Sequence, residues 1–154
     1  MKGNPEIITT LNLILSQELA AINQYVVHSS INANQLYNKL AKKIMHRAQE
    51  EMKHADALID RILFLEGMPI VSNLAEINIG LDITTQINND IKSEQTAIDT
   101  YNKAIEQAEE LLDEGTRKLL SHNLKDEEEH LNYLEGQLSQ LMTLGKENFL
   151  TEQM

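Results

Sequence analysis

Hydrophobic residues recur at steps of three and four along four long segments of the chain, a spacing that places side chains on one face of an α-helix. Polar stretches separate the first two segments, at Asn32-Ala33-Asn34, and the last two, at Leu112-Asp113-Glu114-Gly115. The recurring positions are Leu11, Ile14, Glu18, Ile22 and Tyr25; Ile44, Ala48, Glu51, Ala55, Leu58, Ile62 and Leu65; Ile83, Ile87, Glu94, Ile98, Tyr101 and Ile105; and Leu120, Leu124, Glu127, Leu131, Leu134, Leu138 and Leu141. The pattern predicts an all-α protein whose four long helices face a common core.

One glutamate interrupts each of the four hydrophobic faces. Glu18 and Glu51 are 33 residues apart, Glu94 and Glu127 are also 33 residues apart, and the second pair follows the first by 76 residues. In an antiparallel hairpin, residues equidistant from the turn lie at one level, here roughly 25 Å from it. The four glutamates are therefore expected to meet in the middle of the bundle, and the offset suggests a duplicated helical hairpin.

The link between the two hairpins is too long for a tight turn. Glu66-Gly67-Met68-Pro69 is expected to end the second helix, and the stretch to Gly80 can run the length of the bundle. After Gly145, a short amphipathic tail with Phe149 and Leu150 would pack poorly alone, so we expect it to line an assembly contact. The prediction is one domain over residues 1–154: an up-down four-helix bundle with one long crossover between helices two and three and a short fifth C-terminal helix.

The composition and net charge of the chain disfavour several classes of function. The chain has 154 residues, 42% of them hydrophobic, and a net charge of −11, which disfavours nucleic-acid binding and favours attraction of cations. Lys39, Lys42, Lys43 and Arg47 form the one basic group, which we interpret as a solvated helix face. Without cysteine, there are no disulfides and no thiolate metal ligands. No leader-like start and no long apolar run are evident, so we expect a soluble cytoplasmic protein without membrane contact.

Two of the glutamates open a Glu-x-x-His motif, Glu51-Met52-Lys53-His54 and Glu127-Glu128-Glu129-His130. On a helix, this spacing places a carboxylate and an imidazole on one face. Four ionised carboxylates at one level of an apolar core would cost several kcal/mol each unless cations balanced them. Oxygen and imidazole ligands suit iron, manganese or zinc. The sequence predicts a two-metal centre, with a buried polar network that sets helix register as the alternative.

Several stretches of the chain resemble the bacterioferritin family over essentially the whole length. They are Met1-Lys2-Gly3, Ala21-Ile22-Asn23-Gln24-Tyr25, Glu51-Met52-Lys53-His54-Ala55-Asp56, Arg61-Ile62-Leu63-Phe64-Leu65-Glu66-Gly67, Asn78-Ile79-Gly80 and Asp126-Glu127-Glu128. The resemblance implies the ferritin-like version of the predicted bundle.

The resemblance also implies a di-iron ferroxidase centre within each subunit. Glu51 and Glu127 would bridge the two irons, and the centre would comprise Glu18, Glu51, His54, Glu94, Glu127 and His130. The implied reaction is oxidation of Fe(II) by dioxygen or hydrogen peroxide, with storage as a ferric mineral in a homo-oligomeric shell of 24 subunits. A ferredoxin-type protein is a candidate reductant. Tyr25, two turns from Glu18, matches a tyrosine near the family's centre and is a candidate hydrogen-bond or electron donor, or else a core tyrosine.

Two further sites follow from the resemblance. Met52 matches the methionine that binds a b-type haem at a two-fold interface, although Val26, Met45 and Gln49 depart from the usual pocket. Met45, Met52 and Ile59 recur every seven residues, which by itself indicates an apolar face for a partner subunit. His46 and Glu50 match an inner-surface iron site, with an exposed helical pair as the alternative.

Two other functions remain open at this point. A di-iron peroxidase or oxygenase of rubrerythrin or mini-ferritin type shares the paired Glu-x-x-His motif, although rubrerythrins add a Cys-ligated part and oxygenases usually need extra length. A non-catalytic, haem-carrying subunit of a mixed ferritin shell is the other, and the complete set of six predicted ligands argues against it. His28 and His122 have no ligand partner at helical spacing, so solvated or capping roles are expected for them.

Overall fold

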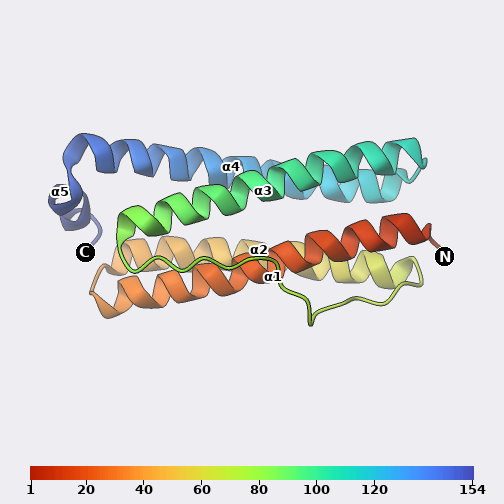
Figure 1. The fold of residues 1–154 in the computed structure, drawn as a ribbon, viewed down its shortest axis with the longest axis horizontal. Helices are drawn as coiled ribbons and strands as arrows, with labels where there is room; N and C mark the ends of the chain where they lie inside the picture. The colour runs from red at the N-terminus through yellow and green to blue at the C-terminus, as the bar shows by residue number, and fades with distance from the viewer.

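The computed structural model describes residues 1–154 as four long helices and a short fifth (Figure 1). They are α1 (Pro5–Asn34), α2 (Asn38–Phe64), α3 (Ile83–Glu110), α4 (Glu114–Leu144) and α5 (Lys146–Thr151). Helix α1 pairs with α2 and α3 with α4, and the crossover between α2 and α3 runs back along the first hairpin (Figure 1). The predicted all-α bundle with one long crossover is confirmed. None of the helices is both long and apolar enough to cross a membrane.

The core is divided into two apolar clusters with a polar layer between them. One cluster includes Leu11, Leu58 and Leu120, and the other includes Ile44 and Leu141. Along each long helix, the predicted glutamate lies between the positions that enter the two clusters. The predicted hydrophobic faces are confirmed, since every position is buried or half-buried. Two well-packed clusters therefore hold the four helices in register on either side of the glutamate level.

Side chains and backbone bonds define the helix ends. Asn4, Asp82 and Asp113 cap α1, α3 and α4 by accepting backbone N–H groups. Helices α1, α2 and α3 each close with the same pair of backbone hydrogen bonds, a Schellman motif, around one residue with positive φ: Leu36, Glu66 and Leu112. Helix α1 continues through Asn34, so the predicted first break lies a few residues too early, at the polar residues of the last turn rather than at the turn itself.

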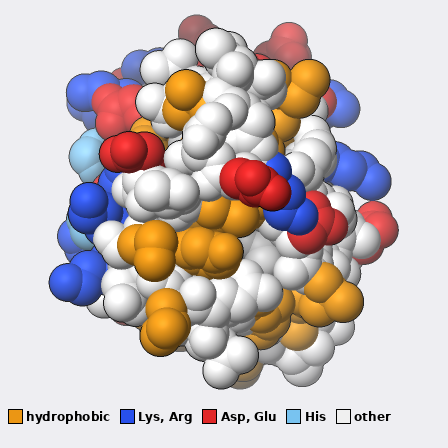
Figure 2. Space-filling view, turned by 90° about the vertical axis from the view of Figure 1, so that its left-hand side faces the viewer, with side chains coloured by type: hydrophobic (Ala, Val, Ile, Leu, Met, Phe, Trp, Pro, Cys, Tyr) orange, Lys and Arg blue, Asp and Glu red, His pale blue; other side chains and the backbone are white.

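Helix α5 corrects an expectation about the C-terminal tail. Phe149 is 1% exposed and packs into the cluster around Leu141, and the Lys39 backbone N–H donates to the Gln153 carbonyl at 3.0 Å. The tail therefore packs well on its own bundle, and its place at an assembly contact stays a prediction. Figure 2 looks onto the end of the bundle that α5 covers, where apolar side chains gather at and below the centre of the face and most basic side chains lie toward its two sides.

Gly80 links the crossover to the bundle, and a side chain there has no room. A Cβ atom would lie 2.5 Å from the Gln86 backbone nitrogen, and the Gly80 N–H donates to His28 Nε2 at 2.9 Å. We expect Gly80→Ala to lower the free energy of unfolding by about 1–3 kcal/mol, because backbone atoms cannot move aside as a flexible side chain would. Denaturant unfolding measures the change. Gly136→Ala is the matched control, since no atom lies within 4 Å of its Cβ position, and a helical alanine there should be neutral or stabilising.

Candidate metal centre

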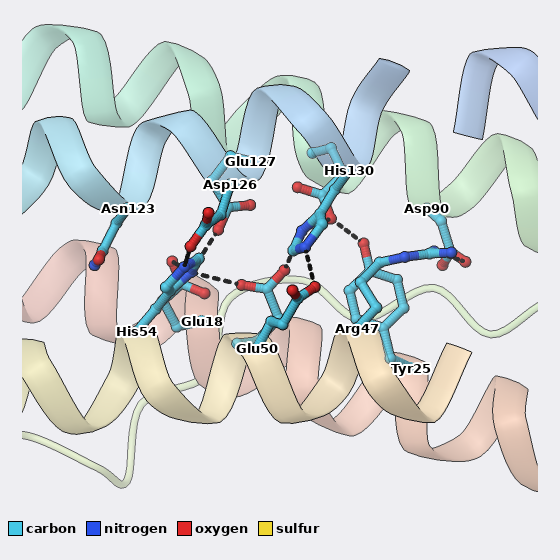
Figure 3. A network of polar contacts seen from close by, with 12 residues as sticks. Glu18, Tyr25, Arg47, Glu50, His54, Asp90, Asn123, Asp126, Glu127 and His130 are labelled. Atoms are coloured by element: carbon cyan, nitrogen blue, oxygen red, sulfur yellow. Dashed lines mark hydrogen bonds and ion pairs between the residues drawn. The ribbon is translucent and has the colours of Figure 1, made fainter. Parts of the chain in front are cut away.

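Six predicted ligand residues come together midway along the bundle (Figure 3). They form two groups whose ligand atoms lie within 4.8 Å of one another, and both groups contain Glu51 and Glu127. The groups are Glu18, Glu51, His54 and Glu127, and Glu51, Glu94, Glu127 and His130. Each helix supplies at least one residue from a polar position on its hydrophobic face. The structure thus brings together every residue predicted from the 33-residue and 76-residue spacings, with two carboxylates common to both groups.

The two histidines are oriented in the same way. His54 Nδ1 lies 3.0 Å from Glu51 Oε2 and 2.8 Å from Glu127 Oε1, and His130 Nδ1 lies 3.0 Å from Glu51 Oε1. The opposite ring nitrogens contact a second carboxylate each: His54 Nε2 lies 2.9 Å from Asp126 Oδ2, and His130 Nε2 lies 2.7 Å from Glu50 Oε2 (Figure 3). A carboxylate at Nε2 fixes the ring and leaves Nδ1 free to bind a metal.

Two buried tyrosines complete the inner layer. The Tyr25 hydroxyl donates to Glu94, and the Tyr101 hydroxyl donates to Glu18. Both side chains are 0% exposed, so each phenol fixes one carboxylate that belongs to a single group. Tyr25 is therefore placed as a hydrogen-bond donor to a candidate ligand, as the sequence suggested. Tyr101 holds the equivalent place in the other half, a role for which it is a weaker candidate than Tyr25 on sequence alone.

Without a metal, this cluster retains protons. Burial, followed by the charges of Glu18 and Glu94, raises the pKa of both Glu51 and Glu127 well above the ordinary value. Burial lowers the pKa of His54, but hydrogen bonds and charge interactions with Glu127 and Glu18 outweigh it and raise that pKa to about 11. Protons thus balance part of the charge that four buried carboxylates would otherwise carry.

The donor atoms fit metal ions better than they fit one another. Eight buried side-chain atoms make no hydrogen bond, and four of them belong to the candidate ligand set: Glu51 Oε1, Glu94 Oε2, Glu127 Oε1 and His130 Nδ1. Buried polar atoms without a hydrogen bond are costly, and half of those in this protein gather at one place. Two divalent cations would satisfy these atoms together, and oxygen and imidazole donors suit iron, manganese or zinc. A network that serves only to set helix register would be expected to satisfy its own members.

A cavity reaches the centre from one side and a pocket from the other. The cavity, of about 90 Å³, lies between α1, α3 and the crossover and is lined by Glu18, Glu94 and Glu127. The pocket, of about 240 Å³, is lined by His46, Glu50 and His130 on the α2–α4 side. Small molecules and ions therefore have space next to both the carboxylates and the imidazoles.

Buried groups next to the centre correct two interpretations of the sequence. Arg47 is 4% exposed, so it does not belong to the solvated face of Lys39, Lys42 and Lys43, which are exposed. His28 is 0% exposed, because its Nδ1 lies 3.0 Å from Asp90 and its Nε2 accepts the Gly80 N–H. Both residues were misassigned because their buried partner, Asp90, lies on another helix and is not at helical spacing.

His46 and Glu50 do form a helical pair, with His46 Nδ1 3.7 Å from Glu50 Oε2. The His46 side chain is 70% exposed, whereas Glu50 is partly buried because it also contacts His130. Glu50 is thus part of the centre's surroundings as well as of the pocket. Met52 is 42% exposed on α2, and Met45, seven residues earlier in the same helix, is half-buried.

The sequence did contain a signal for the residues that were missed. The 76-residue offset of the four glutamates also relates Tyr25 to Tyr101 and Glu50 to Asp126. In the structure, each of these pairs makes the same contact in its own half of the centre. Extending the offset beyond the ligands would have identified both.

Comparison with known proteins agrees with the geometry. A family model described as a ferritin-like domain matches residues 8–144. A bacterioferritin of Brucella melitensis biotype 1 is 38% identical over 97% of this chain and 92% of its own length. A bacterial ferritin of Neisseria meningitidis serogroup B is 38% identical over 100% of both chains, and a bacterioferritin of Streptomyces coelicolor is 37% identical over 98% and 90%. The chain therefore belongs to the ferritin-like family and, within it, to the bacterioferritins.

Proposed function

We propose that this bacterioferritin stores iron and is a ferroxidase, which oxidises Fe(II) at the six-residue centre and delivers Fe(III) to a mineral inside a shell of 24 copies. The observation that carries the proposal is the pair of overlapping buried groups that share Glu51 and Glu127. Their ligand atoms lie close together, and several of them make no hydrogen bond. This arrangement suits two metal ions bound side by side, each with one carboxylate and one imidazole of its own.

The chain's own groups account for positioning and for protons. Glu18 with His54 and Glu94 with His130 would each hold one Fe(II), and Glu51 and Glu127 would contact both. Each Fe(II) gives one electron to the oxidant, so two neighbouring ions reduce one hydrogen peroxide, with two protons, to two waters. The protons held by the cluster in the metal-free state are released when Fe(II) binds.

Assembly into a shell is supported by the family and by the subunit surface. Large apolar side chains along the crossover and the nearby helices are exposed to an extent unusual for a monomer. They include Leu13, Leu63, Phe64, Met68, Val71 and Leu81, which are 53–78% exposed. We infer that neighbouring copies cover these side chains.

Aerobic addition of Fe(II) to the metal-free protein, followed by sizing, tests the proposal. We expect a fast rise of ferric absorbance, followed by a soluble mineral that co-elutes with a particle of about 24 subunits. Bovine serum albumin at equal mass is the control for uncatalysed oxidation. A monomer or dimer that oxidises Fe(II) without retaining a mineral would contradict storage and favour peroxidase or oxygenase chemistry of the rubrerythrin or mini-ferritin type.

We also propose that Met52 ligates a b-type haem shared by two copies. Met52 is exposed, and Met45 and Ile59, seven residues before and after it on α2, are half-buried, as are Leu19 and Val26 on α1. An exposed methionine beside an apolar surface fits an axial ligand together with the edge of a macrocycle. Haem bound there would supply an electron-transfer group at the contact between two subunits.

Reconstitution with haem tests this assignment. The parent protein is expected to show a Soret band with the spectrum of bis-methionine ligation, and Met52→Leu is expected to lose it, because leucine keeps the volume without the sulfur ligand. Met68→Leu, at a methionine that is 76% exposed in the crossover, is the matched control and should keep the band. An unchanged spectrum in Met52→Leu would exclude Met52 as the ligand.

A further inference from the structure

The two halves of the centre are alike in the ligands and in their nearest neighbours. Tyr25 and Tyr101, 76 residues apart, each donate a hydrogen bond to the carboxylate of the opposite hairpin. Glu50 and Asp126, at the same offset, each hold the Nε2 of one histidine. On these contacts alone, the two candidate metal positions would be equivalent.

The equivalence ends at one pair of residues. The 76-residue offset relates Arg47 to Asn123. Arg47 places its guanidinium carbon 4.9 Å from the centre of the Tyr25 ring, whereas Asn123 donates a hydrogen bond to the Tyr101 hydroxyl at 3.2 Å. Figure 3 shows the two at opposite ends of the cluster. One half therefore faces a buried cation, and the other half faces a neutral amide.

Arg47 acts on the half that contains Glu94 and His130. Its guanidinium lies against the ring of Tyr25, whose hydroxyl donates to Glu94, and Arg47 lines the same pocket as Glu50 and His130. In the other half, the charged side chains that contact His54 are carboxylates: Glu18, Glu51, Asp126 and Glu127. Burial favours the neutral form of Arg47, but interactions with Tyr25 and nearby carboxylates outweigh it and raise its pKa, so the guanidinium stays charged.

The counter-ion of Arg47 compensates this charge only in part. Asp90 Oδ2 lies 3.6 Å from Arg47 Nη1, and Asp90 Oδ1 also accepts from Gln24 at 2.8 Å and lies 3.0 Å from His28 Nδ1. Figure 3 places Asp90 on the far side of Arg47 from His130. The carboxylate is thus shared among three groups. Asp90 has no counterpart in the other half, where the offset leads to Ile14.

We propose that Arg47 makes the two metal positions unequal, so that the position of Glu18 and His54 binds a divalent cation more tightly than the position of Glu94 and His130. A fixed positive charge in a low-dielectric interior repels a dication strongly over this range. The inference rests on the proposed function, because it requires both positions to bind metal. It makes Arg47 a positioning residue that sets the order of loading: Glu18 and His54 first, then Glu94 and His130.

Co(II) binding to single-position variants tests the order without relying on oxidation. His130→Ala keeps the position of Glu18 and His54, and His54→Ala keeps the position of Glu94 and His130. We expect the Co(II) dissociation constant, measured by visible absorbance and equilibrium dialysis, to be roughly tenfold or more lower in His130→Ala than in His54→Ala. Equal constants, or the reverse order, would overturn the proposal.

Removing the charge pair tests the cause. In the background Arg47→Gln with Asp90→Asn, which leaves no buried ion unpaired, the two constants should agree within roughly threefold. In the background Arg47→Lys, which keeps the cation, the difference should persist. A difference that survives in the neutral background would exclude Arg47 as its origin, and circular dichroism establishes that each variant is folded. If the parent protein binds no Co(II) at the centre, the proposed metal site itself fails, a result distinct from equal binding at two positions.

Discussion

Glu94→Ala is expected to slow the fast phase of Fe(II) oxidation by roughly 100-fold or more while leaving the bundle folded. Glu94 belongs to only one of the two candidate ligand groups, so under the proposed function its loss would remove one ion and with it the paired transfer of electrons. Burial raises the pKa of Glu94, but hydrogen bonding with Glu127, His130 and Tyr25 outweighs it and lowers that pKa. Glu94 is therefore ionised before metal arrives, and alanine cannot replace its charge.

Stopped-flow absorbance of the ferric product measures the rate, and thermal unfolding with and without Co(II) measures occupancy. The parent should gain about 2.7 kcal/mol of stability at a Co(II) concentration 100 times the dissociation constant, and the variant should gain less at the same concentration. Glu106→Ala, on the exposed face of the same helix, is the matched control. An unchanged fast phase in Glu94→Ala would show that oxidation takes place elsewhere.

The second large expected effect is that of pH on metal binding. Metal binding requires ionised carboxylates and neutral imidazoles, whereas in the metal-free centre His54, with a pKa of about 11, is protonated at neutral pH, and burial raises the pKa of Glu51 and Glu127 well above the ordinary value. We expect Co(II) loading at pH 7 to release roughly two or more protons per subunit, and the dissociation constant to fall about tenfold per pH unit for each proton released per ion. A weakly buffered titration with an indicator dye counts the protons, and His54→Ala should release about one fewer.

A rise in pH is expected to lower the stability of the metal-free protein and to increase the stabilisation by Co(II). The pKa of His54 is raised from 6.5 to about 11, so its contribution to the metal-free protein is fully present below pH 6.5 and is lost as the pH rises through 11. The raised pKa values of Glu51 and Glu127 act in the same direction from about pH 4.5 upward. Between pH 6 and 9 the metal-free protein should lose stability, while the stabilisation by a fixed Co(II) concentration should grow. A proton release near zero would contradict the protonation states assigned to the cluster. So would stability curves that run parallel against pH with and without Co(II).

The fold and the meeting of the four glutamates could be predicted from sequence because both depend on regular spacing. Helical periodicity identified the four hydrophobic faces, and the 33-residue and 76-residue offsets placed Glu18, Glu51, Glu94 and Glu127 at one level of the bundle. The ligand role of these residues stays a prediction until metal binding is measured.

The surroundings of the centre were less accessible to sequence reasoning. Arg47 lies among exposed lysines in the chain, and only contacts across three helices, with Tyr25 and Asp90, explain why it is buried. His28 was misassigned for the same reason. Helical spacing relates neighbours on one helix, whereas these charges are balanced between helices, where spacing along the chain carries no information.

Leu36 and Leu112 close α1 and α3 with positive φ angles of 67° and 57°. Glycine adopts this backbone conformation without strain, and for other residues the left-handed region costs roughly 1–2 kcal/mol. Both leucines are also largely exposed, at 67% and 91%. Strained backbone and exposed apolar surface are each unfavourable for an isolated subunit, and only the second can be offset, by a surface that covers the side chain. A glycine at either turn should therefore stabilise the isolated subunit, and in the proposed shell it would remove apolar surface that a neighbouring copy could cover.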